Sequence, residues 1–284
     1  MPDQPSDAAP AVDVWGIQPP SADDRDANGG EAGEGEPAQR RSRRASHQPR
    51  TDWRLGGRTV LRWREGLLAI ALISLGVAVL AGSMIATVWQ SPWAAASATV
   101  IVWIGMLVPV VWALSRSRPI GLLRVRALDV LYGLVLGGLL RTTQGWIEGL
   151  DGTPAALPTL TRIDGSWGFS TIALDIVAPV VLAPVVEEFF FRAVVLISLY
   201  TVLRRPFGKL TAGLVAALAS TALFVVVHGI SGGAAVSDVV SLSLLGVVCA
   251  ALVLLTGRIW GAVLVHVVYN GSYVALALIG SAMT

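Results

Sequence analysis

From about residue 66 to its C-terminus, the chain is a series of long apolar runs separated by short loops. A helix of about 20 residues crosses a hydrocarbon core of ~30 Å, so an apolar run of about 18 residues or more can span a membrane. Backbone N–H and C=O groups find no water inside lipid, and such runs must therefore be helical. The sequence predicts an all-α, polytopic membrane helix bundle.

Seven runs are long enough, and we expect about seven transmembrane helices within a range of six to eight. The predicted spans are 66–89, 94–114, 127–147, 171–203, 211–229, 238–256 and 259–281. The fourth is too long for one perpendicular crossing and contains Pro179 and Pro184, so we expect it to be strongly kinked or split into two helices. The composition agrees, because 54% hydrophobic and 14% charged residues lie outside the range of soluble domains.

Residues 1–64 have a different composition and are predicted to be a disordered cytoplasmic tail, followed by a transmembrane domain over 65–284. The tail begins with many acids among Pro, Gly, Ala and Ser, which predicts disorder. From Arg40 onward it is arginine-rich, which is typical of a stretch that attracts the anionic lipid of the bilayer rather than nucleic acid. No cleavable signal peptide precedes the first apolar run, so that run is expected to be a permanent anchor.

Arginines in the loops predict the orientation in the membrane. The basic stretch before Gly66, the loops 116–126 and 204–209, and Arg258 all fall on one side if there are seven spans. Basic loops mark the cytoplasmic side, and the N-terminus is therefore expected in the cytoplasm. The Ala-, Gly- and Arg-rich composition favours a bacterial cell membrane.

Three charged residues lie within the apolar segment 183–195, which reads A-P-V-V-E-E-F-F-F-R-A-V-V. One such charge at the bilayer centre costs about 2.5–3.5 kcal/mol, so these residues need partners or a function. Glu188 and Arg192 are four residues apart and can pair on one helix face. Glu187 is rotated by about 100° from Glu188 and has no partner on its own helix.

Two histidines lie in other apolar runs, and each has a companion four residues away on the same helix face. Phe224 precedes His228, and Asn270 follows His266. A carboxylate beside imidazoles can activate water, and an amide donor can bind the oxyanion formed at an attacked carbonyl. Together with Glu187, these residues provide the groups of a hydrolase; the alternative is that they form hydrogen bonds between helices.

These residues resemble the signature of the CPBP family, the group of Rce1-type CAAX proteases and bacteriocin-processing or Abi-like proteins. Its motifs are E-E-x-x-x-R, F-x-x-x-H and H-x-x-x-N on successive helices, and all three are present in order. They are Glu187, Glu188 and Arg192; Phe224 and His228; and His266 and Asn270. The resemblance covers a protease-like core at 171–281.

The resemblance implies an intramembrane endopeptidase that cleaves a membrane-associated protein or peptide. Glu187 with His228 would activate water, His266 and Asn270 would stabilise the oxyanion, and Glu188 and Arg192 would support the site. A metal-dependent mechanism is the alternative, in which Glu187, His228 and His266 hold zinc and leave one position open. No H-E-x-x-H spacing is present to favour it.

Counting along the predicted spans places Glu187 and His228 about 24–26 Å from the cytoplasmic ends of their helices, but His266 only about 11 Å. A single site requires these depths to agree. We expect helix tilt and the kinked fourth span to bring them level, rather than a last helix that starts below the membrane surface.

Other readings of the sequence remain. Gly229 to Gly232 reads G-I-S-G and resembles the rhomboid motif, which would make Ser231 a nucleophile. A non-catalytic immunity or scaffold protein and, less favoured, a transporter would also carry buried charges. Arg141 and Asp175 lie near the outer ends of neighbouring spans and are expected to form an ion pair between helices.

Overall fold

The computed structural model describes residues 52–55, 60, 62–150, 157–160, 168, 171–232 and 235–283. All of them belong to Pro49–Thr284, the second of two units into which the chain divides. The regular structure of these residues is helical, with no strand among them, and the predicted all-α class is confirmed. The predicted disorder of residues 1–51 concerns a part of the chain outside the described residues.

The helices follow one another along the chain in the following order. They are η2 (Trp53–Leu55), α2 (Glu65–Val88), α3 (Ala94–Arg116), α4 (Ala127–Leu150), η3 (Thr171–Leu182), α5 (Ala183–Glu188), η4 (Phe189–Leu196), α6 (Ile197–Gly232), α7 (Val236–Thr256) and α8 (Trp260–Met283). Five stretches among the described residues are long and apolar enough to cross a membrane: α2, α3, 172–230, α7 and α8. The second half of α4 is more polar, because it contains the run Arg141–Gln144.

The stretch 172–230 contains two of the predicted spans. Its 59 residues would extend about 90 Å as one helix, far beyond the ~30 Å core. The chain folds back within α6 at Gly208, whose φ of 77° is a conformation that glycine adopts without strain. Before that turn, Pro179 and Pro184 lie in a helix whose η3 and η4 segments have wide π-type turns. Such turns occur often at functional sites.

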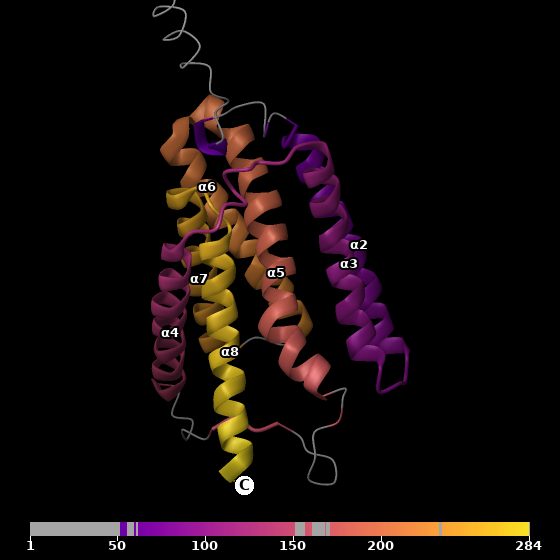
Figure 1. Ribbon diagram of the computed structural model, residues 1–284. Coiled ribbons are helices and arrows are strands. Elements are labelled where there is room, and N and C mark those ends of the chain that lie inside the picture. The colour runs from indigo at the N-terminus through magenta and orange to yellow at the C-terminus, as the bar shows by residue number, and fades with distance from the viewer. Residues whose placement is uncertain are drawn as a thin grey trace, which may run out of the picture. The chain divides into compact units, whose positions relative to one another are not determined.

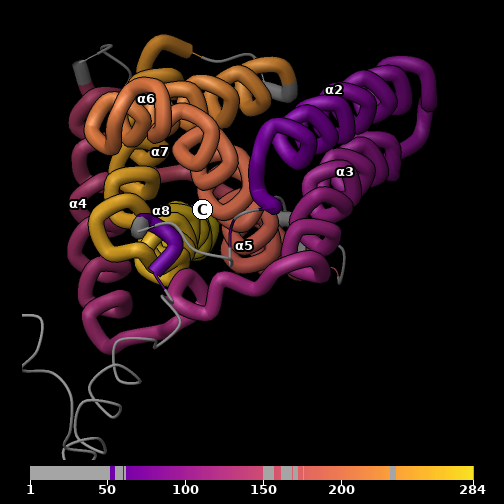
Figure 2. Tube along the Cα trace, turned by 90° about the horizontal axis from the view of Figure 1, so that it is seen from above, coloured from indigo at the N-terminus to yellow at the C-terminus, as the bar shows by residue number. Residues whose placement is uncertain are grey.

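The helices form a bundle in which α5 occupies a central position. Figure 1 shows α2 and α3 together on one side of α5, and α4, α7 and α8 on the other. Figure 2, seen from above, gives the same grouping, with α6 beside α7. The side chains of α5 and of its continuation in η4 are almost all buried, whereas much of α2 and α3 is exposed. The charges of the fourth predicted span therefore lie in the middle of the bundle.

Glycines allow α4 and α8 to approach closely. A Cβ on Gly133 would lie 2.7 Å from the Cβ of Leu264, and one on Gly137 would lie 2.8 Å from the carbonyl oxygen of Val265. Neither position has room for a side chain, which explains the small residues in α4. This contact holds the part of α8 that carries His266 against α4.

The segment before α2 packs against the end of α7. The Trp53 side chain is buried, and its Nε1 donates a hydrogen bond to the Gly257 carbonyl at 3.1 Å, while its ring meets Tyr200 edge to face. Gly257 ends α7 in the left-handed conformation that favours glycine. Arg54 hydrogen-bonds to Asp52 and thereby lowers the pKa of that carboxyl group. The last part of the predicted tail is therefore held on the helices.

An ion pair joins α4 to the turn before α8. Arg258 donates from Nη2 to Asp129 at 2.7 Å, and the Asp129 side chain is fully buried. The sequence suggested Arg258 only as a loop cation, whereas its guanidinium is committed to this pair. The backbone N–H of Ile259 also donates to the Leu122 carbonyl at 3.0 Å. These bonds fix the starting position of α8.

Candidate active site

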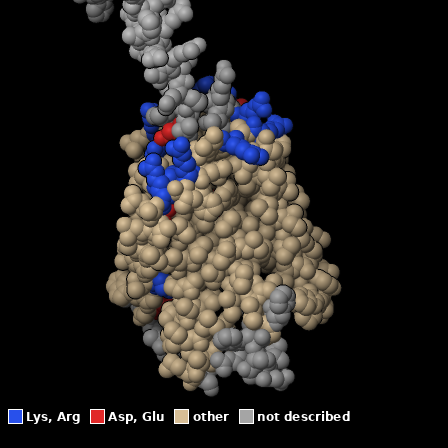
Figure 3. Space-filling view, viewed as in Figure 1, with Lys and Arg blue, Asp and Glu red and all other residues tan. Residues whose placement is uncertain are grey.

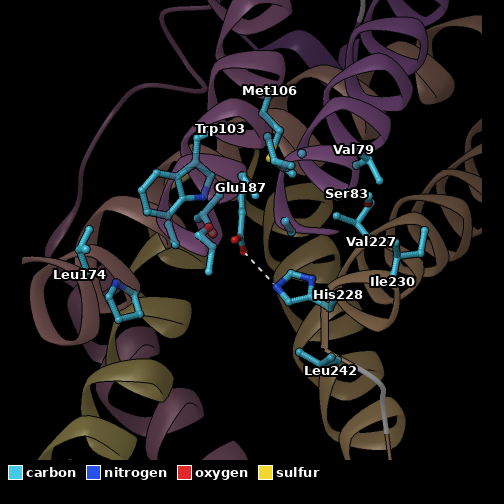
Figure 4. Close-up of a pocket in the computed structure, with 18 of the residues that line it drawn as sticks. Val79, Ser83, Trp103, Met106, Leu174, Glu187, Val227, His228, Ile230 and Leu242 are labelled. Carbon is cyan, nitrogen blue, oxygen red and sulfur yellow. Dashed lines mark hydrogen bonds and ion pairs between the residues drawn. The ribbon is translucent and has the colours of Figure 1, made fainter. Parts of the chain in front are cut away.

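All four residues for which the sequence suggested a catalytic role line one cavity of about 720 Å³. Glu187 comes from α5, His228 from α6, and His266 and Asn270 from α8. The opposite wall is formed by α2 and α3. Figure 4 shows the Glu187 carboxylate and the His228 ring pointing toward one another across this space.

Glu187 lies between the two imidazoles. Its Oε2 is 3.7 Å from Nε2 of His228 and 3.8 Å from Nε2 of His266. Both separations exceed a direct hydrogen bond and suit contacts made through a water molecule. The Glu187 side chain retains 10% exposure, so that it faces the cavity while being shielded from bulk solvent.

A backbone carbonyl fixes the orientation of His228. Its Nδ1 lies 2.9 Å from the carbonyl oxygen of Phe224, four residues earlier in α6. A carbonyl can only accept, so Nδ1 carries the proton and Nε2 of the neutral ring is an acceptor facing Glu187. The Phe224 ring packs on that of His228, with centroids 4.3 Å apart, and meets His266 edge to face at 5.8 Å. Phe224 therefore holds both imidazoles.

Glu188 orients the second imidazole. Its Oε1 lies 3.0 Å from Nδ1 of His266, which donates to it, and Nε2 of His266 is thereby directed toward Glu187. The sequence suggested only a pair between Glu188 and Arg192. The carboxylate instead serves both Arg192 and His266, and this link across helices could not be read from spacing within one helix.

Arg192 neutralises Glu188 deep in the bundle. Its Nη1 is 3.2 Å from Glu188 Oε1, and both side chains are fully buried. The guanidinium also lies 4.7 Å from the centre of the Phe224 ring, and its Nη2 donates a long bond of 3.4 Å to the Gly246 carbonyl. Such a pair holds neighbouring groups in place, and it leaves Glu187 as the carboxylate that faces the cavity.

Asn270 is partly committed to the helix that carries Glu187. Its Nδ2 donates a hydrogen bond of 2.8 Å to the carbonyl of Pro179. In the π-type turns of η3, the carbonyl of one residue accepts from the N–H of the residue five positions later. For the Pro179 carbonyl that residue is Pro184, which has no N–H. The amide of Asn270 satisfies the carbonyl instead. One of its two N–H donors is thus used, and the side chain still lines the cavity.

The three motifs lie at the same depth in the bundle, as a single site requires. Glu187 and His266 lie 3.8 Å apart, although the counts along the sequence placed them far apart. Figure 1 shows α8 starting well below the upper end of α6. The late start of α8, fixed by the bonds around Arg258 and Ile259, helps to bring His266 level with Glu187.

Other residues suggested by the sequence lie outside this cluster. Ser231 is near the end of α6, and its side chain is not among those described. The side chain of Asp175 is also outside the described part, so its pairing with Arg141 stays a prediction. Arg141 itself donates to the Tyr269 carbonyl at 2.9 Å and to Gln144 at 2.8 Å. The bond to Tyr269 ties α4 to α8 next to Asn270.

The α2 and α3 wall was not anticipated. Its lining residues are Val79, Gly82, Ser83, Ala86 and Thr87 of α2 and Ala95, Ala98, Thr99, Val102, Trp103 and Met106 of α3. The small residues recur at helical spacing, but the same pattern is typical of simple helix packing. Nothing in the sequence distinguishes the two uses.

The arrangement of the described residues does not provide a metal site. No group of three or more histidine, cysteine, aspartate or glutamate side chains among them could hold a metal ion. The metal-dependent alternative, with Glu187, His228 and His266 as zinc ligands, stays a prediction.

Comparison with known proteins agrees with the resemblance found in the sequence. Residues 169–272 match the family described as type II CAAX prenyl endopeptidase Rce1-like. The match contains all three motifs and is consistent with a CPBP family protease. No curated protein and no solved structure matches the chain. The family match and the apolar helices support an integral membrane protein and, in general, an endopeptidase.

Proposed function

We propose that the chain is an intramembrane endopeptidase in which Glu187 and His228 activate water to cleave a peptide bond of a membrane-associated substrate. The observation that carries the proposal is the position of Glu187 Oε2, 3.7 and 3.8 Å from two imidazole nitrogens in one cavity. A water molecule next to Oε2 can hydrogen-bond to both the carboxylate and Nε2 of His228.

In the proposed reaction, water attacks the carbonyl carbon of the substrate while Glu187 takes its proton. The carbonyl oxygen gains the negative charge and needs hydrogen-bond donors. The second N–H of Asn270 is one donor, and Nε2 of His266 is another when it carries a proton, with Nδ1 held by Glu188. Collapse of the intermediate breaks the C–N bond, and the proton passes to the leaving amine.

The roles of the two neighbouring carboxylates differ because their surroundings differ. Glu188 is fully buried and bound by Arg192 and His266, so it has no access to water. Glu187 lines the cavity, and its ion-pair partners among the described residues are the two imidazoles. This contrast supports Glu187, and not Glu188, as the base.

The proposal is tested by substrate trapping. Cells carrying Glu187→Gln or His228→Ala are compared with wild type, and the membrane proteome is searched for a precursor that accumulates uncleaved. Glu65→Gln is the matched control, because Glu65 is an exposed carboxylate at the start of α2. We expect accumulation in the first two variants and none in the control.

A non-catalytic scaffold is the alternative function, and the same strains distinguish it. If Glu187→Gln and His228→Ala variants are stably produced but the proteome is unchanged from wild type, the hydrolytic role is refuted. If Ser231→Ala alone blocks processing, the nucleophile is the serine and the role of Glu187 as base is wrong.

A further inference from the structure

Basic side chains gather at one end of the bundle. Exposed cations there are Arg62, Arg64, Arg116, Arg118, Arg124, Arg126, Arg205 and Lys209. Figure 3 shows most of the blue side chains at the end where α2 begins. The turn between α2 and α3 at the other end, 89–93, contains no charged residue. Because Lys and Arg concentrate on cytoplasmic loops, the arginine-rich end corresponds to the cytoplasmic side.

The cavity lies toward the opposite end. At 1.5 Å per residue, Thr87 is about 33 Å along α2 from Glu65, and Ala95 is about 32 Å along α3 from Arg116. Both residues line the cavity, and these lengths match the ~30 Å thickness of the hydrocarbon core. Met106, the innermost lining residue of α3, is about 15 Å from Arg116. The cavity therefore extends from the non-cytoplasmic surface to about the middle of the membrane.

The helices that carry His228 and Glu187 agree with this placement. His228 and Ile230 lie near the end of α6, far along the helix from Lys209. Leu174 lies near the start of η3, about 45 Å of helix away from Arg204 if every turn were α-helical. Each of these helices thus presents its non-cytoplasmic half to the cavity.

The walls suit an internal segment of polypeptide. Seven of the eleven lining residues of α2 and α3 have small side chains: Gly82, Ser83, Ala86, Thr87, Ala95, Ala98 and Thr99. Small side chains leave room for an extended backbone between the wall and Glu187. No Arg or Lys is among the described residues that line the cavity, so a free C-terminal carboxylate would lack a cationic partner there.

We propose that substrates enter this cavity from the non-cytoplasmic face, and that the scissile bond lies at the non-cytoplasmic end of a membrane-anchored polypeptide. The inference rests on the proposed endopeptidase function. A C-terminal tail presented from the cytoplasm would meet the arginine-rich end, which about 15 Å of helix separates from Met106.

Cysteine accessibility tests the side from which the cavity opens. Cys249 is the only cysteine and is fully buried, so a Cys249→Ala background allows single cysteines to be read. Ala95→Cys and Ser115→Cys place exposed thiols at the two ends of the same helix. Intact cells are treated with a charged, membrane-impermeant maleimide. We expect labelling of Ala95→Cys in intact cells and of Ser115→Cys only after permeabilisation.

The reverse pattern would overturn the proposal, and Thr87→Cys on α2 repeats the test if Ala95→Cys is not produced.

A second measurement concerns the substrate: the adduct at position 95 should block processing of the trapped precursor, whereas the adduct at 115 should not. If Glu187→Gln abolishes processing but the adduct at 95 has no effect, the path of the substrate is wrong and the catalytic role stands. If labelling is as expected but Glu187→Gln has no effect, the orientation stands and the catalytic role fails.

Discussion

Removing Arg192 should destabilise the protein by leaving a buried charge without its partner. Arg192 and Glu188 are both fully buried and 3.2 Å apart. Removal of one member of a buried pair costs about 3–5 kcal/mol, because the remaining ion is neither solvated nor neutralised. Arg192→Leu also loses the contact of the guanidinium with the Phe224 ring, worth about 0.5–2 kcal/mol.

Glu188→Gln leaves the guanidinium unpaired and should carry a similar cost of about 3–5 kcal/mol. If the two changes acted independently, the double variant would lose about 6–10 kcal/mol. It should instead be more stable than either single variant, because both charges are absent and the glutamine introduced at position 188 retains an oxygen that can accept from His266 Nδ1.

The measurement is the free energy of unfolding of the purified protein in detergent micelles, by denaturant titration. Glu187→Gln is the comparison variant. Among the described residues, the ion-pair partners of Glu187 are the two imidazoles, so this substitution should lower the free energy of unfolding by about 1 kcal/mol or less. A double variant that loses the sum of the single effects would refute the buried pair as the scaffold of the site. So would an Arg192→Leu protein as stable as wild type.

Three further outcomes are expected. Gly137→Ala places a Cβ 2.8 Å from a backbone oxygen of α8 and should lower the free energy of unfolding by about 1–3 kcal/mol. The control Gly138→Ala meets nothing within 4 Å and should be neutral or stabilising. Equal effects of the two changes would contradict the close contact of α4 and α8. Arg258→Ala leaves the buried Asp129 unpaired and should cost about 3–5 kcal/mol in the same titration, against about 0.5 kcal/mol for the exposed Arg124→Ala. Processing of the trapped precursor should persist in EDTA, and loss of activity that zinc restores would show a metal-dependent mechanism.

The sequence predicted the helical class and the positions of the helices because lipid allows few solutions. Apolar run length alone determines where a helix can cross, and the predicted spans agree with the helices to within a few residues. The i and i+4 relations also hold within single helices, as in Glu188 with Arg192 and in Phe224 with His228. Local periodicity is sufficient for contacts of this kind.

Contacts between helices could not be predicted in the same way. The hydrogen bond from His266 to Glu188 depends on the depth at which α8 starts, and that depth is set by Arg258 and Asp129, residues far apart in the sequence. Likewise, the bond from Asn270 to Pro179 requires the wide turns of η3. Each depends on tertiary geometry that no motif spacing encodes.

The two walls of the cavity differ in what they can contribute to a reaction. Glu187, His228, His266 and Asn270 all lie within residues 169–272, the part of the chain that matches the endopeptidase family. The facing wall comes from α2 and α3, which lie outside that match and contribute no titratable side chain to the lining formed by the described residues. If hydrolysis is the function, the first wall determines the chemistry, and the second determines which polypeptide fits against it. Substitutions in α2 and α3 should therefore change which substrates are cleaved more than how cleavage occurs.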